Sequence, residues 1–217
     1  MKTVLVLGGT QFFGKRLVQR LLDEGHRVTI ATRGMTQDNF GDKVERLTID
    51  RENGESLYKA FEGKKWDIVY DQSCFSPIEA REAAEALKGK TGRYIFTSSQ
   101  AVYEFGTNHK EDNFNPENFH FEYKTRREYP GYAGYQEAKR ASDAVLFSMP
   151  ELDTVAVRFP IVIGKDDYTD RLKFHVDLIK AGKPIGIPNP EMKFSFITSE
   201  DAAEFLLNIG QDQFTGL

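Results

Sequence analysis

The stretch "VLVLGGTQFFGKRLVQRLL", Val4–Leu22, predicts a buried strand that passes through a glycine turn into a helix. Its first residues are apolar without interruption, as expected of a strand that is covered on both faces. After Gly14, apolar side chains recur at helical spacing with charged ones between them. A strand, a glycine-rich turn and a helix in this order are typical of the phosphate-binding start of a dinucleotide-binding fold.

The glycines of such a turn have separate functions. The first permits the tight turn, the second lets the backbone approach the pyrophosphate, and the third allows the helix to pack closely on the strand. Gly8 and Gly9 serve the turn here, and Gly14 serves the packing. Gln11 occupies the position of the second glycine, where the backbone approaches the pyrophosphate. Backbone N–H groups at the helix N-terminus supply the main attraction for phosphate, and a Gln amide can also donate. The predicted phosphate-binding residues are therefore Gly8, Gly9, Thr10, Gln11, Phe12, Phe13 and Gly14.

Two basic residues directly after the turn favour the same interpretation. Lys15 and Arg16 fall in the first turn of the predicted helix, where each would oppose the helix macrodipole by roughly 0.3–1 kcal/mol. An anion bound beside them would remove this cost. The alternative is an ordinary tight turn between strand and helix, with both charges solvated.

The end of the second predicted strand bears on the choice of cofactor. An NAD site places Asp or Glu there to bind the ribose 2′-hydroxyl, whereas an Arg accommodates the 2′-phosphate of NADP. The segment "VTIATRG" offers Arg33 and no acid, so NADP is favoured and NAD remains an alternative. Asp50, which closes "RLTID" after the third strand, could accept a hydrogen bond from the adenine amino group. Arg33 could equally be a surface residue, and Asp50 a turn residue.

Strand-length apolar runs alternate with helical patterns along the chain, which predicts an α/β fold with a doubly wound parallel sheet of the Rossmann type and helices on both faces. We expect an NAD(P)-binding domain over residues 1–160 and a small, partial substrate-binding lobe over 161–217, interleaved with the last Rossmann elements. Residues 104–134 are irregular and predict a loop insertion beside the site. The predicted strands are Thr3–Leu7, Arg27–Ala31, Val44–Ile49, Trp66–Tyr70, Arg93–Thr97 and Thr154–Arg158. The predicted helices are Gly14–Glu24, Ser56–Phe61, Pro77–Leu87 and Gly134–Phe147, the third capped by Ser76 and Glu79.

A serine, a tyrosine and a lysine are the candidate catalytic residues. Ser99 ends the strand "RYIFTSS", and "GYQEAK" carries Tyr135 and Lys139 four residues apart, on one face of a helix. Making a tyrosine a base at neutral pH takes a shift of about 3 units from its usual pKa, roughly 4 kcal/mol. An ammonium about 5 Å away supplies ~3 kcal/mol where the effective dielectric is near 20. The pattern therefore predicts Tyr135 as an acid or base, Lys139 as its activator and Ser99 as a hydrogen-bond donor to substrate. The alternative is an ordinary amphipathic helix.

Composition excludes several other classes of protein. The chain has 217 residues, of which 40% are hydrophobic, and its net charge of −4 argues against a general nucleic-acid binder. Cys74 is its one cysteine, so no internal disulfide can form. The chain has no signal-peptide pattern and no apolar run long enough for a membrane span, so we expect a cytoplasmic protein. His109, Glu111, Asp112 and His120 match the spacing of no dedicated metal site, and no metal is expected.

With these motifs the chain resembles the extended branch of the short-chain dehydrogenase/reductase superfamily, the NAD-dependent epimerase/dehydratase family. The glycine turn is similar to the family's opening motif except at Gln11, "IFTSSQAVY" places Ser99 at its active-site serine, and Tyr135 and Lys139 fall on its YxxxK. "VRFPIVIGKDD", Val157–Asp167, and "FSFITSEDAAEFLL", Phe194–Leu207, resemble it further. Extended members usually continue well beyond the second of these segments, whereas this sequence ends at "GQDQFTGL". We expect a truncated form or a small substrate lobe.

The resemblance implies a tightly bound nicotinamide cofactor and an enzyme that oxidises, reduces, epimerises or dehydrates a small molecule at a hydroxyl or carbonyl, often in a nucleotide sugar. Lys139 would then also bind the nicotinamide ribose. As in relatives, the helices Pro77–Leu87 and Gly134–Phe147 could form the interface of a homodimer. The glycine turn is also similar to stem-loop RNA-binding proteins of chloroplasts and NmrA-like regulators, so a non-catalytic NAD(P) sensor or RNA-binding protein is the alternative function.

Overall fold

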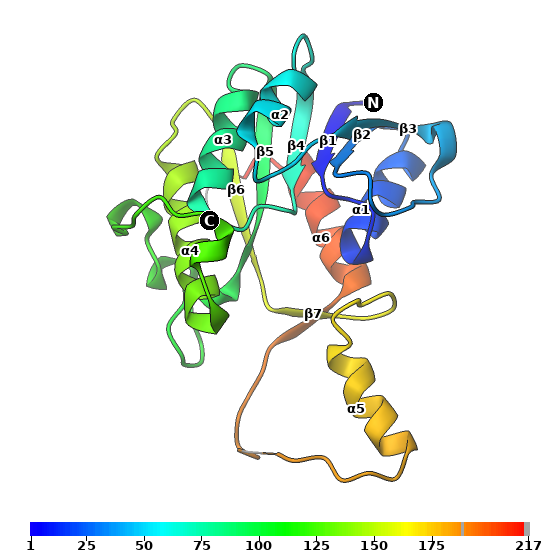
Figure 1. Cartoon of the computed structure of the whole chain (residues 1–217), viewed down its shortest axis with the longest axis vertical. Helices are drawn as coiled ribbons and strands as arrows, with labels where there is room; N and C mark the ends of the chain where they lie inside the picture. The colour runs from blue at the N-terminus through cyan, green and yellow to red at the C-terminus, as the bar shows by residue number, and fades with distance from the viewer. Residues whose placement is uncertain (188, 215–217) are drawn as a thin grey trace.

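A parallel sheet of six strands forms the centre of the protein, as predicted (Figure 1). The computed structural model describes residues 1–187 and 189–214, so residues 188 and 215–217 of the predicted C-terminal lobe lie outside the described residues. The strands are β1 (Thr3–Leu7), β2 (Arg27–Thr32), β3 (Val44–Thr48), β4 (Trp66–Asp71), β5 (Thr91–Ser99) and β6 (Thr154–Phe159). Their order is β3-β2-β1-β4-β5-β6. The order reverses between β1 and β4, and ligands of doubly wound sheets bind at this switch point, beyond the carboxyl ends of the strands.

Helices cover both faces of the sheet, which confirms the doubly wound arrangement. Helices α1 (Phe12–Asp23) and α6 (Ser199–Gln211) pack on each other and on the face that presents Val4 and Val6 of β1. Helices α2 (Gly54–Ala60), α3 (Pro77–Leu87) and α4 (Gly131–Phe147) cover the face that presents Leu5 and Leu7. Alternate residues of β1 are thus buried in two separate cores, which explains its uninterrupted apolar sequence.

Three helices begin earlier than predicted, among them α2, which starts at Gly54 rather than at Ser56. Helix α1 starts at Phe12, because the apolar side chain of Phe12 is buried and Gln11 becomes the N-cap. Helix α4 starts at Gly131 and reaches Gly134 only one turn later. A Cβ at Gly134 would come within 2.4 Å of the carbonyl carbon of Tyr129, so this glycine serves close backbone packing inside the helix.

Helix α3 has the predicted bounds, and its N-terminus forms half of the predicted capping box. Ser76 Oγ accepts a hydrogen bond from the backbone N–H of Glu79 at 3.4 Å. The Glu79 carboxylate, however, accepts from the backbone N–H of Phe75 at 3.0 Å, one residue before the N-cap. The difference arises because the same carboxylate also binds an arginine, described below.

The segment between β5 and α4 is irregular, as predicted. Its short 3₁₀ helices are η2 (Gln100–Val102), η3 (Glu111–Asn113), η4 (Pro116–Asn118) and η5 (Arg126–Glu128); a further one, η1 (Gly41–Lys43), precedes β3. We call residues 104–130 the insertion. His109 stacks on the ring of Tyr103 at 5.1 Å between centroids. Within residues 1–187 and 189–214, no three side chains of the metal-ligating types come together.

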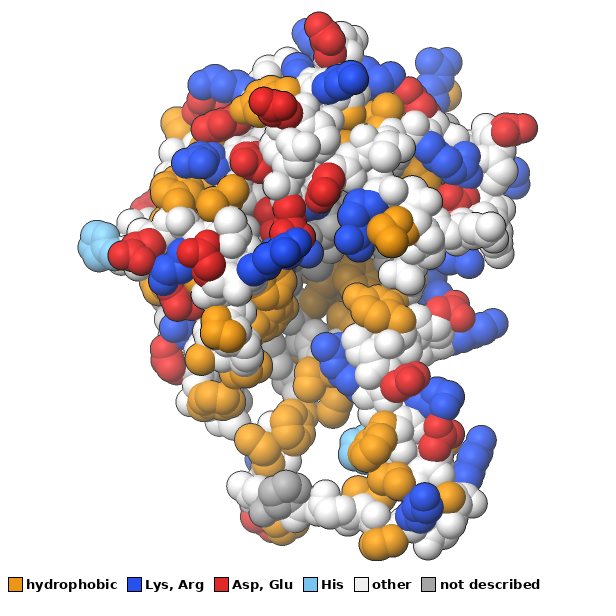
Figure 2. All heavy atoms as spheres, viewed as in Figure 1, with side chains coloured by type: hydrophobic (Ala, Val, Ile, Leu, Met, Phe, Trp, Pro, Cys, Tyr) orange, Lys and Arg blue, Asp and Glu red, His pale blue; other side chains and the backbone are white. Residues whose placement is uncertain are grey.

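The C-terminal part of the chain forms an arm that projects from the sheet (Figure 1). Strands β7 (Ile161–Ile163) and β8 (Phe196–Thr198) pair in parallel at its base, and helix α5 (Arg171–Lys180) has no buried residue. Hydrophobic side chains are exposed along the arm, among them Phe174, Ile179 and Phe194 (Figure 2).

Across the part of the chain that the structure describes, every helix is too short or too polar to traverse a lipid bilayer.

Candidate functional site

A cavity of about 210 Å³ lies beyond the carboxyl ends of β1, β2 and β3. The segments that follow these three strands form its wall, and the residue Ser73 after β4 and Arg126 of the insertion complete it. The lining residues are Gly8, Thr10, Gln11, Ala31, Thr32, Arg33, Met35, Thr36, Ile49, Asp50, Arg51, Glu52, Ser73 and Arg126. The fold therefore brings the glycine turn together with Arg33 and Asp50, which are separate in the sequence.

The other residues of the predicted phosphate-binding turn lie behind the cavity wall. Gly9 has a φ of +90°, and a Cβ there would lie 2.9 Å from Val18 Cγ2 and 3.0 Å from Val6 Cγ1. A Cβ at Gly14 would overlap the side-chain oxygen of Gln72, which extends from the end of β4. Gly9 and Gly14 thus let strand, helix and Gln72 approach closely, in agreement with the packing role predicted for Gly14.

Gln11 does not block the turn. It is exposed, has an extended backbone as the N-cap of α1, and makes no side-chain cap hydrogen bond. The left-handed conformation falls instead on Phe12, with a φ of +49°. This conformation costs a non-glycine residue roughly 1–2 kcal/mol. Phe12 is 6% exposed and packs edge-on against Phe13 and Tyr168, so burial offsets the strain, and both phenylalanines point into the protein.

Arg16 does not face the cavity. Its Nε donates to Glu200 at 2.7 Å and its Nη1 to Asp166 at 3.3 Å. Acidic residues of the C-terminal part therefore balance this charge, and the inference from Arg16 to a bound phosphate is wrong. Only the fold could show this, because Glu200 lies far along the sequence.

Arg33 and Asp50 differ in how many hydrogen bonds they form with the rest of the protein. Arg33 is exposed and lines the cavity, and within the described residues it forms no ion pair or side-chain hydrogen bond. Asp50 accepts a hydrogen bond from the backbone N–H of Glu52 at 3.0 Å, as a turn residue does, and it also lines the cavity. Among the residues that the structure describes, no group donates to its second carboxylate oxygen.

Lys139 joins the ends of two strands. Its Nζ donates to the carbonyl oxygen of Cys74 at 2.8 Å and to that of Thr97 at 3.0 Å, and it lies 4.7 Å from the centroid of the Phe96 ring. Lys139 is 7% exposed. An ammonium has three N–H donors, so two are committed to the backbone after β4 and on β5, and one remains.

Tyr135 and Ser99 lie half-buried near this lysine. Tyr135 is one helical turn before Lys139 on α4, and its ring lies 5.7 Å from the ring of Phe75. Ser99 ends β5 and accepts a hydrogen bond from the backbone N–H of Ala101 at 3.1 Å, which leaves its O–H free to donate. In residues 1–187 and 189–214, no hydrogen bond joins the side chains of Ser99, Tyr135 and Lys139 to one another.

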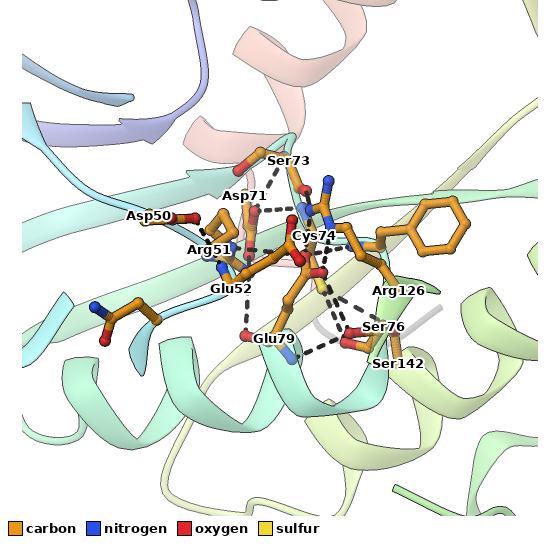
Figure 3. A network of polar contacts seen from close by, with 12 residues as sticks. Asp50, Arg51, Glu52, Asp71, Ser73, Cys74, Ser76, Glu79, Arg126 and Ser142 are labelled. Atoms are coloured by element: carbon orange, nitrogen blue, oxygen red, sulfur yellow. Dashed lines mark hydrogen bonds and ion pairs between the residues drawn. The ribbon is translucent and has the colours of Figure 1, made fainter. Parts of the chain in front are cut away.

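A buried ionic network lies beneath the cavity (Figure 3). Asp71 of β4 is 0% exposed; it accepts from Arg51 Nη2 at 2.9 Å, from the Tyr94 hydroxyl at 2.5 Å, and from the backbone N–H groups of Ser73 and Cys74. Burial by itself would lower the pKa of Arg51, but the acidic groups around it, Asp71 first among them, together outweigh burial and raise the net pKa. Burial also raises the pKa of Tyr94 well above its usual value.

Glu79 and Arg126 extend this network into the insertion. Arg126 donates to Glu79 from Nε at 2.6 Å and from Nη2 at 2.7 Å, a bidentate pair. The hydrogen bonds from Arg126 to Glu79 raise the pKa of the guanidinium. Its guanidinium also lies 5.8 Å from the centroid of the Phe75 ring. The insertion is thus fixed to the N-terminus of α3 at the edge of the cavity.

Sequence reasoning identified Glu79 only as a helix cap and did not identify Arg51, Asp71 or Arg126. One signal was available: Asp71 ends a strand that is otherwise largely apolar, "WDIVYD", where an acid must find partners if it is buried. Its partners come from other elements, so the sequence did not indicate which they are.

Comparisons with known proteins agree with this architecture. A model of the NAD dependent epimerase/dehydratase family matches residues 4–77. The chloroplast stem-loop binding protein of 41 kDa b of Arabidopsis thaliana is 27% identical over 96% of this chain, which spans 55% of that protein's length. The Bordetella bronchiseptica enzyme WbmH, solved in complex with NAD+, has a TM-score of 0.77 at 16% identity. The alignment covers 100% of this chain and 74% of WbmH. Thermus thermophilus UDP-glucose 4-epimerase, solved with NAD, has a TM-score of 0.72 at 19% identity, with 99% of this chain and 76% of that one covered. The family model thus matches residues 4–77, and the likeness to the solved structures shows a shared fold, a six-stranded parallel sheet with helices on both faces.

Proposed function

We propose that this chain binds a nicotinamide dinucleotide and catalyses an oxidation, reduction, epimerisation or dehydration at a hydroxyl or carbonyl of a small molecule, such as a nucleotide sugar. The observation that carries the proposal is the cavity in which the glycine turn, Arg33 and Asp50 meet, at the same edge of the sheet as Ser99 at the end of β5 and Lys139 of α4, which binds the backbone at the ends of β4 and β5. The structural neighbours described above are enzymes solved with NAD, which supports the same cofactor class.

The residues around the cavity fit a dinucleotide. Gly8 lines the cavity with a φ of +108°, a conformation that residues with a side chain rarely adopt. In the described part of the chain, two buried polar atoms beside it have no hydrogen-bond partner, Ser73 Oγ and Gln72 Nε2. Unpaired buried polar groups are costly, and a bound diphosphate would supply acceptors for both. Gly8, Thr10, Gln11, Gln72 and Ser73 would hold the phosphates, and Asp50 the adenine.

We favour NADP over NAD because of Arg33. It is an exposed cation on the cavity wall after β2, without an ion pair among the described residues, and it would bind the 2′-phosphate. No acid occupies the position after β2 where an NAD site holds the ribose hydroxyls. The charge of Arg33 would remain uncompensated with NAD bound.

The chemistry of the proposed reaction divides among the three residues at the strand ends. A bound nicotinamide accepts or supplies a hydride. Tyr135 would exchange a proton with the substrate oxygen, and the free O–H of Ser99 would donate to that oxygen. The third N–H of the Lys139 ammonium would face the phenol or the ribose, while the hydrogen bonds of the other two fix the position of the ammonium. At an effective dielectric near 20, an ammonium about 5 Å away favours the phenolate by ~3 kcal/mol.

We also propose that residues 161–217 contribute a substrate lobe to the NAD(P)-binding domain of residues 1–160. A second cavity, of about 1020 Å³, supports this division. Gln100 and Tyr103, directly after Ser99, line one side of it, and Met192 and Phe194 of the arm line the other. A substrate held there would lie between the two parts.

Calorimetric titration with NADPH and NADH tests the cofactor assignment. We expect NADPH to bind more tightly than NADH, and Arg33→Ala to weaken NADPH binding roughly 10- to 100-fold because a charge-assisted hydrogen bond contributes ~1.5–3 kcal/mol. NADH binding should not change in this variant. Arg171→Ala, an exposed arginine at the start of α5, is the matched control. Tighter binding of NADH than NADPH would overturn the NADP preference, and binding of neither would overturn the proposal.

Turnover is tested on a panel of nucleotide sugars with NADP or NADPH. Tyr135→Phe should abolish turnover and leave the affinity for NADPH unchanged, since the phenol lies outside the residues that line the cavity. Wild-type turnover in this variant would remove Tyr135 from the chemistry.

The similarity to a stem-loop binding protein favours a second candidate function, a cofactor sensor or RNA-binding protein without turnover. Affinity for NADPH together with no reaction on the panel, and a gel shift with an RNA stem-loop, would support it. The net charge of −4 weighs against RNA binding.

A homodimer through α3 and α4 is a further proposal, which sedimentation of the purified chain tests.

A further inference from the structure

Glu79 is a buried carboxylate whose two oxygens are both fully engaged (Figure 3). It is 2% exposed. Its Oε1 accepts from Arg126 Nε at 2.6 Å and from Ser76 Oγ at 3.3 Å. Its Oε2 accepts from Arg126 Nη2 at 2.7 Å and from the backbone N–H of Phe75 at 3.0 Å. This side chain therefore makes far more contacts than a helix cap requires.

These hydrogen bonds fix the short turn Cys74–Ser76, which follows β4. Two residues of that turn contact the proposed catalytic pair. The carbonyl oxygen of Cys74 accepts from Lys139 Nζ at 2.8 Å, and the ring of Phe75 lies 5.7 Å from the ring of Tyr135. The turn is thus the structural element that contacts both Lys139 and Tyr135.

Arg126 holds the same turn from the insertion. Its guanidinium lies 5.8 Å from the centroid of the Phe75 ring, and its Nη2 donates to the carbonyl oxygen of Ser73 at 3.4 Å. Arg126 and Tyr135 therefore both lie beside the Phe75 ring. If the guanidinium moves, the ring loses one of them, and its position against Tyr135 is no longer determined.

We propose that Glu79 and Arg126 are positioning residues, which hold the Cys74–Ser76 turn so that Phe75 and the Cys74 carbonyl place Tyr135 and Lys139 for proton transfer. This inference rests on the proposed function of that pair. Neither residue is catalytic, because Glu79 contacts the pair only through the turn and Arg126 only through Phe75 and Glu79. A displacement of about 1 Å in a reacting group can lower a rate on the order of 100-fold, so a small shift of the turn suffices.

The proposal predicts a graded series at Arg126. Arg126→Gln removes the charge and the bidentate pair, so it leaves Glu79 buried with only the longer contact to Arg51, whose Nε lies 3.9 Å from Glu79 Oε2. Arg126→Lys keeps the charge but lacks the planar fork, and should restore part of the effect. Arg127→Gln is the matched control, because Arg127 is the next residue of η5 but its side chain is 81% exposed and pairs with Glu52. Glu79→Gln tests the other half of the pair, provided that it folds.

The first measurement is the NMR signal of the Tyr135 ring in cofactor-free protein with labelled tyrosines, assigned by its loss in Tyr135→Phe. We expect Arg126→Gln to shift this signal, because the Phe75 ring moves, and Arg127→Gln to leave it unchanged. The second is the division between kcat and KM. Arg126→Gln should lower kcat more than 10-fold, with Arg126→Lys intermediate; because Arg126 also lines the cofactor cavity, the affinity of each variant for NADPH is measured separately.

The outcomes separate this inference from the proposed function. An unmoved Tyr135 signal in a folded Arg126→Gln variant, or equal kcat in Arg126→Gln and Arg127→Gln, would overturn the positioning role even if NADPH binds and turnover occurs. A shifted Tyr135 signal in protein that binds no NADPH would instead overturn the function, while it would support the link from Arg126 to Tyr135.

Discussion

Arg158 of β6 and Asp143 of α4 form a buried ion pair, with Arg158 Nη2 3.1 Å from Asp143 Oδ2 and side chains that are 5% and 0% exposed. The same guanidinium donates to the carbonyl oxygens of Glu111 at 2.9 Å and Phe114 at 3.2 Å, both in the insertion. One arginine thus ties sheet, helix and insertion together, on the opposite end of the insertion from Arg126.

Arg158→Met should destabilise the protein by about 3–5 kcal/mol, because it leaves Asp143 buried and unpaired. Burial already raises the pKa of Asp143, although Arg158 opposes this. Without the arginine, native Asp143 holds a proton that the unfolded chain releases, so stability rises as the pH falls toward the usual carboxyl range. Urea unfolding at pH 8 and pH 5 should show the smaller loss at pH 5. Arg20→Met removes an exposed pair with Glu204 and is the control, with an expected loss under ~1 kcal/mol.

Lys139→Met should cost about 1–3 kcal/mol of unfolding free energy even without cofactor, since it leaves the carbonyl oxygens of Cys74 and Thr97 without their donor. Lys88→Met removes an ammonium that is 64% exposed beside Glu151 and should cost less than ~1 kcal/mol. Urea denaturation of both variants measures the difference. Equal losses would mean that the buried ammonium contributes no more than a surface one.

Gly9→Ala should destabilise the protein by roughly 2–4 kcal/mol, because it combines backbone strain at a φ of +90° with contacts of 2.9 and 3.0 Å to two core valines. Gly25→Ala separates the two effects. Gly25 has a φ of +78° and nothing within 4 Å of an added Cβ, so only the strain of about 1 kcal/mol remains. Chemical denaturation compares the variants, and a similar loss in both would show that the packing around Gly9 adjusts freely.

The thiol of Cys74 should react with a disulfide reagent at a rate that still increases between pH 7 and pH 10. Burial raises the pKa of Cys74 to about 12, so the thiolate is scarce in the native protein throughout this range. The unfolded chain should instead reach a plateau above about pH 9, where an ordinary thiol is ionised. The same shift means that stability is lost as the pH rises from about 9 toward 12, since the native thiol keeps a proton that the unfolded one releases. A plateau near pH 9 in the native protein would contradict both statements.

The sequence predicted the elements that depend on local pattern. The apolar run before Gly8, the Ser76-Pro77 start of α3 and the alternation of strands with helices each reflect burial or backbone preference over a few residues. Errors occurred where a distant partner outweighed the local rule. Arg16 is compensated by Glu200 and Asp166 rather than by a ligand, and the Glu79 carboxylate accepts from Phe75 while it binds Arg126.

Local patterns were enough to predict the doubly wound sheet and the candidate set of Gly8, Arg33, Ser99, Tyr135 and Lys139, because strand and helix periodicity and the glycine turn are properties of a few neighbouring residues. Which charges meet depends on the folded arrangement. Asp71, Arg51, Glu79 and Arg126 come from different elements, and the free energy of a buried charge depends on the partner that the fold brings within a few ångströms. No local pattern specifies that partner.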